Sequence, residues 1–286
     1  MQGKIGSTGF VNKILKENDL SAKKKFGQNF LTDQNILSQI VAGADIDRDT
    51  LVIEIGPGLG SLTERLCQVA GKVLCYEIDG DLIPILKDNL KEFNNFEVIH
   101  NDILEVDINA DIDKYQGNLS KVYLVANLPY YITTPIILGL LSKTDRIRKY
   151  VMMMQLEVAD RICGKPKTKD YNALSIAIGY RAKATRIAKV PRTVFIPAPN
   201  VDSAVVRLDL YDVLPYKAKN EEHFFELIRL CFNQRRKTLT NNLGSKYSKE
   251  FITKMLIDNN IKPTARAEEL SINDFIRLSD YIVANS

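Results

Sequence analysis

The sequence predicts an α/β protein with a mostly parallel sheet, followed by a small helical domain. Short runs rich in Val, Ile and Leu alternate with helix-length segments, which is typical of βαβ units. A glycine-rich turn joins the first of these runs to the helical segment that follows it. After residue 212 the apolar residues recur at helical spacing instead. We therefore expect an α/β domain over 26–212 and a helical domain over 213–286.

The expected strands are short apolar runs bounded by polar or turn residues. In chain order they are 51–56, 72–78, 96–100, 122–127, 150–156, 173–180 and 203–210. The last two flank the proline-rich segment 190–202, which we expect to be a long extended connection because proline fixes its own dihedral angle and restricts the preceding residue.

The two ends of the chain differ from the α/β domain. Residues 1–25 contain three glycines and a run of three lysines, so we expect a flexible N-terminal arm. The C-terminal part shows helical patterns in "EEHFFELIRLCF", "SKEFITKMLIDNN" and "SINDFIRLSDYIVA". Ser271 is the expected N-cap of the last helix.

The composition argues against several classes of protein. There is no run of eighteen apolar residues and no N-terminal signal segment, so we expect a cytoplasmic protein without a membrane span. The four cysteines show no C-x-x-C spacing and the two histidines lie far apart, which predicts neither a metal site nor a disulfide framework. Nothing indicates obligate association, so we expect a monomer.

The net charge of +4 hides a strong asymmetry along the chain. Residues 26–140 carry seven basic and seventeen acidic side chains, whereas residues 141–240 carry twenty basic and ten acidic ones. The basic half predicts contact with a polyanion.

The glycine-rich turn and two acids predict a nucleoside pocket. Gly56, Gly58 and Gly60 follow the strand 51–56, at the sheet edge where open α/β sheets bind ligands. Glu77 and Asp102 follow the next two strands, at distances suited to a ribose and an adenine amino group. The pocket suits NAD or S-adenosylmethionine.

Two features favour S-adenosylmethionine. Glu54, just before the glycines, can pair with or orient the cationic methionine end while crowding a pyrophosphate. The chain also lacks a convincing set of residues for hydride transfer, because neither histidine lies in a plausible catalytic loop.

The segment "NLPY" ends the fourth strand on the same sheet edge as the pocket. The side-chain oxygen of Asn127 and the carbonyl of Leu128 can accept the two hydrogens of an aromatic amine, which directs its lone pair at a methyl group. Pro129 fixes the carbonyl, and Tyr130 offers a face on which a base can stack. The alternative is an ordinary Asn-x-Pro turn.

Several motifs in order resemble the ribosomal RNA adenine N6,N6-dimethyltransferases, which modify two adjacent adenines near the 3′ end of 16S rRNA. They are "FGQNFL", "EIGPGLG", "YEID", "NDIL", "NLPYYITTP", "MMMQLEVADRI", "VFIPAPNVDSAVVRL" and "NQRRKTLTNNL", between about Lys25 and Leu243. The resemblance implies a Rossmann-like class I methyltransferase fold, S-adenosylmethionine as cofactor, 16S rRNA in the immature 30S subunit as partner, and a role in subunit maturation.

The resemblance also implies roles for individual residues. Asn29 and Leu31 would close over the cofactor, and Ile78 would pack on its adenine. Phe195 would sandwich the flipped target adenine against Tyr130. The remaining implied roles are Gly56 at the methionine end, Glu77 at the ribose, Asp102 at the adenine, Asn127 at cofactor and target amine, and Leu128, Pro129 and Tyr130 at the methyl-transfer site.

Tyr131 stands where many members have Asn, and we interpret it as a wall or packing variation. RNA contacts are expected from the basic half, including Arg146, Arg148, Lys149, "RICGKPKTK", "RAKATRIAKVPR" and "RRK" at 235–237. Two other functions remain open at this point: a macrolide-resistance type methyltransferase of 23S rRNA, and a non-catalytic RNA-binding assembly factor on the same fold.

Overall fold

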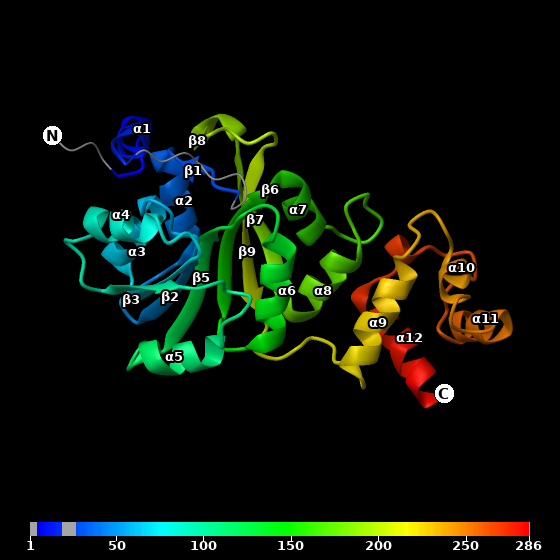
Figure 1. The fold of residues 1–286 in the computed structure, drawn as a ribbon. Coiled ribbons are helices and arrows are strands. Elements are labelled where there is room, and N and C mark those ends of the chain that lie inside the picture. The colour runs from blue at the N-terminus through cyan, green and yellow to red at the C-terminus, as the bar shows by residue number, and fades with distance from the viewer. Residues whose placement is uncertain (1–4, 19–26, 286) are drawn as a thin grey trace. The chain divides into compact units, whose positions relative to one another are not determined.

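The computed structural model describes residues 5–18 and 27–285, which form two compact units (Figure 1). The first unit is Met1–Ala159 with Thr185–Asp209, and the second is Asp160–Ala184 with Leu210–Ser286. The sequence places one boundary at residue 212, whereas the structure also assigns the segment 160–184 to the second unit. That segment packs its apolar side chains into the core of the C-terminal helices.

A seven-stranded sheet forms the centre of the first unit, in the order β4-β3-β2-β5-β6-β9-β7. The pairs from β4 to β6 are parallel, and β9 runs antiparallel to β6. The expected mostly parallel sheet is therefore confirmed. The strands are β2 (Thr50–Ile55), β3 (Lys72–Glu77), β4 (Phe96–His100), β5 (Lys121–Asn127), β6 (Lys149–Gln155), β7 (Ala182–Val190) and β9 (Ser203–Leu210).

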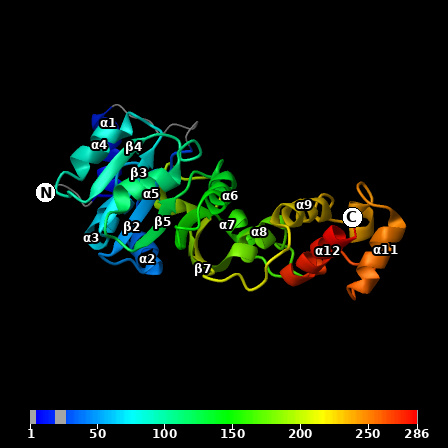
Figure 2. The same ribbon diagram turned by 90° about the horizontal axis from the view of Figure 1, so that it is seen from below.

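Helices cover both faces of this sheet (Figure 2). On one face α2 and α3 pack into an apolar cluster with alternate residues of the strands, such as Val73 and Cys75. On the other face Tyr76 donates a 2.8 Å hydrogen bond to Asp111 of α5. The helices are α2 (Gln34–Ala44), α3 (Ser61–Val69), α4 (Leu82–Asn89), α5 (Ile108–Gln116), α6 (Thr133–Lys143) and α7 (Leu156–Ile162).

The expected flexible N-terminal arm is wrong for residues 5–18, because they contain helix α1 (Thr8–Glu17). Ser7 caps the helix by accepting a hydrogen bond from the backbone of Phe10. Val11 is fully buried in a cluster with Phe30, Leu59 and Leu82, so apolar burial holds the helix against the domain. The run of three lysines lies outside the described residues.

The expected strand 173–180 is also wrong, because these residues form helix α8 (Ala173–Arg181). Asn172 and Ser175 make a capping box that starts a helix. The helix is apolar on most sides because it is buried among other helices, so it lacks the polar stripe that identifies a surface helix.

The proline-rich connection 190–202 is mostly irregular, with two short elements. They are the 3₁₀ turn η2 (Arg192–Val194) and strand β8 (Phe195–Ile196). Strand β8 pairs antiparallel with β1 (Phe30–Leu31).

The second unit is a helical bundle around a core that includes Tyr180, Phe224 and Phe275. Ser271 caps its last helix as expected, accepting a hydrogen bond from the backbone of Asp274. That last helix is α12 (Ile272–Ala284), and the other helical elements after residue 212 are α9 (Glu221–Cys231), α10 (Leu239–Leu243), α11 (Lys249–Asp258) and the 3₁₀ turn η3 (Ala267–Glu269).

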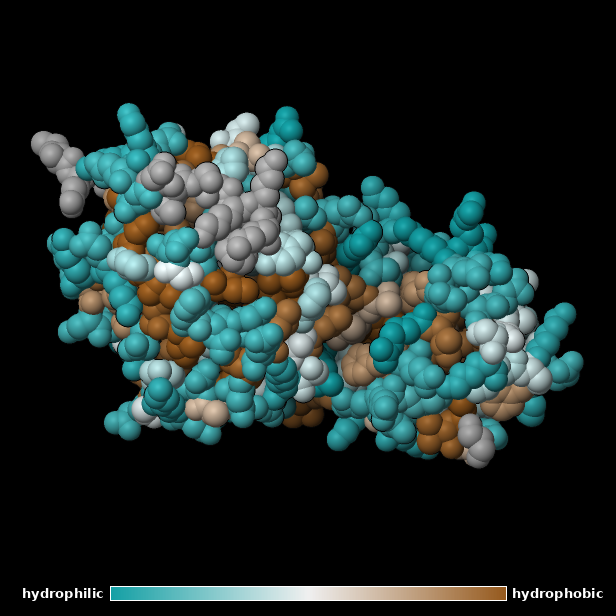
Figure 3. Space-filling view, viewed as in Figure 1, coloured by the Kyte–Doolittle hydropathy of each residue, from teal (hydrophilic) through white to brown (hydrophobic). Residues whose placement is uncertain are grey.

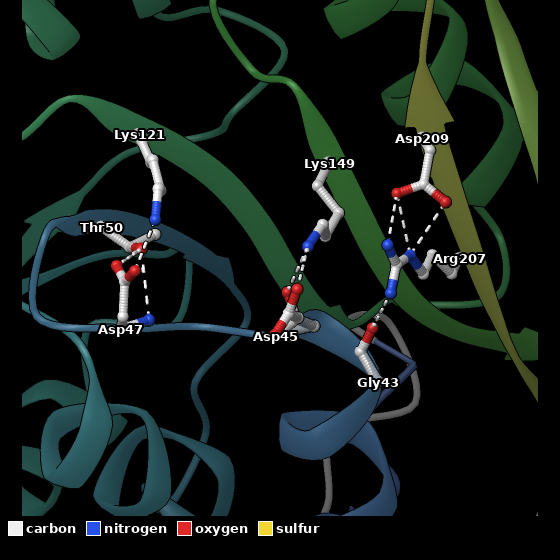
Figure 4. Close-up of polar contacts among 9 residues, drawn as sticks. Gly43, Asp45, Asp47, Thr50, Lys121, Lys149, Arg207 and Asp209 are labelled. Carbon is white, nitrogen blue, oxygen red and sulfur yellow. Dashed lines mark hydrogen bonds and ion pairs between the residues drawn. The ribbon is translucent and has the colours of Figure 1, made fainter.

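Polar side chains of the sheet hold the C-terminal end of α2 and the loop that follows it (Figure 4). Lys149 donates to the Ala44 carbonyl at 2.9 Å and lies 3.5 Å from Asp45. Arg207 donates to the Gly43 carbonyl at 3.1 Å. Because Lys149 is only 7% exposed, the expectation that it meets RNA phosphates is wrong.

The surface of the first unit mixes hydrophobic and hydrophilic side chains, as the face in Figure 3 shows. Its exposed large apolar side chains include Ile78, Tyr131, Leu138 and Val201. Among the described residues, no helix is long and apolar enough to cross a membrane.

Candidate active site

A cavity opens at the carboxyl ends of β2, β3 and β5, the edge at which parallel α/β sheets bind ligands. All of its lining residues belong to the first unit. The structure brings every sequence-predicted site residue to this cavity except Phe195.

The glycine-rich turn shapes the floor of the cavity. Gly56, Gly58 and Gly60 all have positive φ angles, of 68°, 58° and 91°, which favour glycine. A Cβ atom on Gly60 would lie 2.9 Å from Leu86 of α4, so this position also needs a small residue for packing. The turn leads directly into the N-terminus of α3, whose first backbone N–H groups have no helical partners.

Glu77 is held at the end of β3 by two backbone amides. Its carboxylate accepts from Gly58 N at 3.2 Å and from Asp79 N at 2.9 Å. Burial raises the pKa of Glu77, whereas these hydrogen bonds oppose the rise. A carboxylate has about four acceptor sites, so two bonds leave capacity for the hydroxyl groups of a ribose.

Glu54 lies deeper in the same cavity and is 1% exposed. Its carboxyl accepts a 3.6 Å hydrogen bond from the Cys75 thiol. Burial, with the nearby charge of Glu77, raises the pKa of Glu54 to about 8. No ion pair to Glu54 occurs among residues 5–18 and 27–285, so the carboxyl lines the cavity without a cationic partner.

The other cofactor residues expected from the sequence line the walls of the cavity. Asp102 is fixed by accepting from the Leu104 amide at 2.9 Å. Ile78 is 41% exposed at the cavity, where its side chain can cover a planar group. Leu31 lies in strand β1 and Asn29 directly precedes it, and both line the cavity.

The "NLPY" segment lines the cavity at the end of β5. Asn127 Nδ2 donates to the Asn29 carbonyl at 3.3 Å, so its side-chain oxygen is left to accept. Leu128 N donates to Met153 O of β6 at 3.1 Å, which anchors the main chain. The Pro129 carbonyl accepts from Thr133 Oγ1 at 2.9 Å and fixes the start of α6.

Ser203 is a site-supporting residue that the sequence analysis missed. The Tyr130 hydroxyl and Ser203 Oγ form a 2.5 Å hydrogen bond, and Ser203 is fully buried at the start of β9. The signal was present, since Ser203 belongs to the motif "PAPNVDS" whose role was left open. This hydrogen bond links Tyr130, the residue expected to stack on a base, to strand β9, which lies far away in the sequence.

Phe195 differs from the expectation. Its side chain is 3% exposed and belongs to the apolar cluster that also contains Leu31, its partner in the β1–β8 pair. It is not among the residues that line the cavity. The expected sandwich of a base between Tyr130 and Phe195 is therefore not formed by the side chains in this structure.

The cavity fits S-adenosylmethionine on its own chemistry. Glycines allow close approach, Glu77 suits a ribose, Asp102 suits an amino group, and the unpaired carboxyl of Glu54 suits a cation.

A family model described as Ribosomal RNA adenine dimethylase matches residues 19–284. The chain is 47% identical over 285 residues to Ribosomal RNA small subunit methyltransferase A of Geobacillus sp. (strain WCH70), covering 98% of each chain. It is 47% identical over 273 residues to the protein of that name from Lactococcus lactis subsp. lactis (strain IL1403), covering 94% of this chain and 93% of the relative.

Two solved structures that are similar to this chain carry names related to those of these relatives. A dimethyladenosine transferase from Plasmodium falciparum matches with a TM-score of 0.73 and 27% identity, covering 87% of this chain and 95% of that one. The 23S rRNA methyltransferase ErmE matches with a TM-score of 0.68 and 27% identity, covering 88% and 98%. The resemblance and the Rossmann-like fold expected from the sequence are thus confirmed. The chain belongs to the ribosomal RNA adenine dimethylase family.

Proposed function

We propose that this enzyme transfers methyl groups from S-adenosylmethionine to N6 of two adjacent adenines near the 3′ end of 16S rRNA, in the immature 30S subunit. The observation that supports the proposal most directly is that "NLPY" lines the same cavity as the glycine-rich turn, Glu77 and Asp102. Methylation of the immature subunit would give the protein a role in subunit maturation. The protein would then act in the cytoplasm, together with its substrate. We also propose that the protein acts as a monomer.

The bound cofactor supplies an electrophilic methyl group on a sulfonium. Glu77 would bind the ribose and Asp102 the adenine, while Ile78 would cover the adenine face. Gly56 would let the backbone approach the methionine end, and the segment containing Asn29 and Leu31 would close over the cofactor and exclude water.

Asn127 and Leu128 position the target amine. The Asn127 side-chain oxygen and the Leu128 carbonyl accept its two hydrogens, so that its lone pair is withdrawn from the ring and faces the methyl group. Neither group acts as a strong base; the amine nitrogen loses one proton to solvent after it gains the methyl group. Pro129 restricts the backbone here, and Tyr130 stacks on the extruded base.

The basic loops of the second unit provide a surface for RNA phosphates. The Arg235 side chain bonds to the Lys169 carbonyl, which brings the loop 165–169 and the loop 235–237 together. Lys165, Lys167 and Arg236 in these loops are exposed. Contacts with phosphates contribute binding affinity and fix the position of the RNA on the protein, but they do not distinguish one base sequence from another.

The test is methyl transfer from labelled S-adenosylmethionine to 30S particles that lack these methyl groups, with the product mapped by nuclease digestion. We expect dimethyladenosine near the 3′ end of 16S rRNA. Asn127→Ala should lower the rate by about 100-fold or more, the order of loss when one preorganised polar group is removed. Asn94→Ala, an exposed asparagine before β4, should not change it.

Parallel reactions with 23S rRNA separate the alternatives. Methylation of 23S rRNA instead of the particles would contradict the proposed substrate. Cofactor binding without transfer to either RNA would contradict the proposed catalysis and favour an assembly role.

A further inference from the structure

Tyr131 is an exposed aromatic side chain at the mouth of the cavity, next to the proposed stacking residue. Its side chain lines the cavity and is 54% exposed. The sequence analysis interpreted it as a wall or packing residue, but a ring with half of its surface in solvent contributes little to packing. Its neighbour Tyr130 is by contrast partly buried and bonded to Ser203.

The ring of Tyr131 is nevertheless held in place. Gly27 has a φ angle of 62°, and a Cβ atom at that position would lie 3.2 Å from Cδ1 and 3.4 Å from Cε1 of Tyr131. The ring therefore rests closely against the glycine backbone, which supports one part of it. Tyr131 is 54% exposed, and its hydroxyl forms no hydrogen bond with other described residues.

The electrostatic surroundings keep this ring neutral. Burial and the nearby carboxylate of Asp102 both raise the pKa of Tyr131, so the phenol stays uncharged at physiological pH. A neutral aromatic surface of fixed orientation suits a base, because every base has a face that can stack regardless of sequence. Phosphates would instead require a cation.

We propose that Tyr131 is a positioning residue that stacks on the nucleotide adjacent to the target adenine. This inference rests on the proposed function, in which two neighbouring adenines react in turn. When one base lies against Tyr130, the next base of the same strand leaves the helical stack and requires a partner of its own. Tyr131 is the adjacent residue of the chain and faces the cavity mouth, so it supplies that partner and sets the register of the strand.

The test compares Tyr131→Ala with Tyr131→Phe, which keeps the ring. The matched control is Tyr216→Ala, since Tyr216 is 53% exposed and belongs to the second unit. KM and kcat are measured with 30S particles lacking the methyl groups, and cofactor affinity is measured separately by titration calorimetry. Urea unfolding midpoints establish that each variant is folded.

Tyr131→Ala should raise KM for the particles by about 30-fold, the middle of the range for one base stacked on an aromatic ring. Its kcat should fall less than KM rises, and its cofactor Kd should stay within about twofold of wild type. Tyr131→Phe and Tyr216→Ala should both resemble wild type.

Three results would overturn the inference. An unchanged KM in Tyr131→Ala would show that no base stacks there, and an equal loss in Tyr131→Phe would assign the effect to the hydroxyl. A loss of cofactor affinity as large as the rise in KM would show that Tyr131 contacts the cofactor instead of a base. If the wild type itself does not methylate the particles, the proposed function fails instead, so the two failures are distinguishable.

Discussion

Replacing Glu54 by Gln should stabilise the free protein at alkaline pH. Glu54 is 1% exposed and lines the cofactor cavity. Burial, joined by the charge of Glu77, raises its pKa from 4.5 to about 8. In the unfolded chain this carboxyl ionises near pH 4.5, whereas in the folded protein it keeps its proton up to about pH 8.

The sign and size of the effect follow from this difference. Between these two pH values the folded state binds one more proton at Glu54 than the unfolded state does. The contribution of Glu54 to the unfolding free energy is therefore highest below pH 4.5 and falls until the pH passes about 8. At about 1.4 kcal/mol for each pH unit, the 3.5 units between these values give a loss of up to about 5 kcal/mol. Gln cannot ionise, so Glu54→Gln avoids this loss.

The assay is urea unfolding of wild type and Glu54→Gln at pH 5, 6.5 and 8. The difference in unfolding free energy should be small at pH 5 and should grow by a few kcal/mol toward pH 8. Glu97→Gln, an exposed carboxyl on β4, should keep the wild-type pH dependence. Parallel pH profiles for wild type and Glu54→Gln would refute the reasoning.

The same substitution should weaken the binding of S-adenosylmethionine. A cation in the cavity favours the ionised carboxyl, so binding to the wild type near pH 7 should release a proton. Calorimetry in buffers of different ionisation enthalpy measures this release, which Glu54→Gln should abolish. Both results together would show that Glu54 lowers the stability of the empty protein and raises its affinity for the cofactor, a combination that is common at functional sites.

Three further substitutions test the fold and the site. Gly71→Ala should lower the unfolding free energy by more than about 2 kcal/mol, because its Cβ would lie 2.3 Å from the Arg48 carbonyl oxygen; an unchanged melting temperature would contradict this. Val11→Asp should detach α1 and weaken cofactor binding, because the apolar cluster around Val11 includes three residues that line the cavity. Cofactor affinity is measured by titration, and an unchanged affinity would show that α1 does not support the cavity. Ser203→Ala should lower kcat about fivefold, because it removes a hydrogen bond of about 1 kcal/mol from Tyr130. Steady-state kinetics equal to those of the wild type would show that Ser203 does not position Tyr130 for the reaction.

The sequence was sufficient to predict the cavity because its residues follow the ends of parallel strands. Gly56, Glu77, Asp102 and Asn127 all stand where an apolar run stops, and such ends meet at one edge of a parallel sheet. That these four residues lie close together follows from the sheet topology, which the alternation of strands and helices already specifies. It can therefore be predicted without knowing any individual side-chain contact.

Elements stabilised by tertiary packing were harder to predict. The segment 173–180 is apolar on most sides, so its periodicity does not separate a buried helix from a buried strand. The capping box of Asn172 and Ser175 favours the helix, but it is a weaker signal than the apolar run. Helix α1 likewise depends on Val11 fitting among side chains far away in the sequence.

The short β1–β8 pair joins Phe195 to a segment that lines the cavity. Leu31 and Phe195 stand opposite each other, and Thr32 donates to the Val194 carbonyl at 2.8 Å, so the motifs "QNFL" and "VFIP" form one unit. Leu31 faces the cavity while Phe195 is buried in the shared apolar cluster. In this arrangement Phe195 supports the cofactor wall. A role for Phe195 in base binding therefore requires that its side chain leave this apolar cluster.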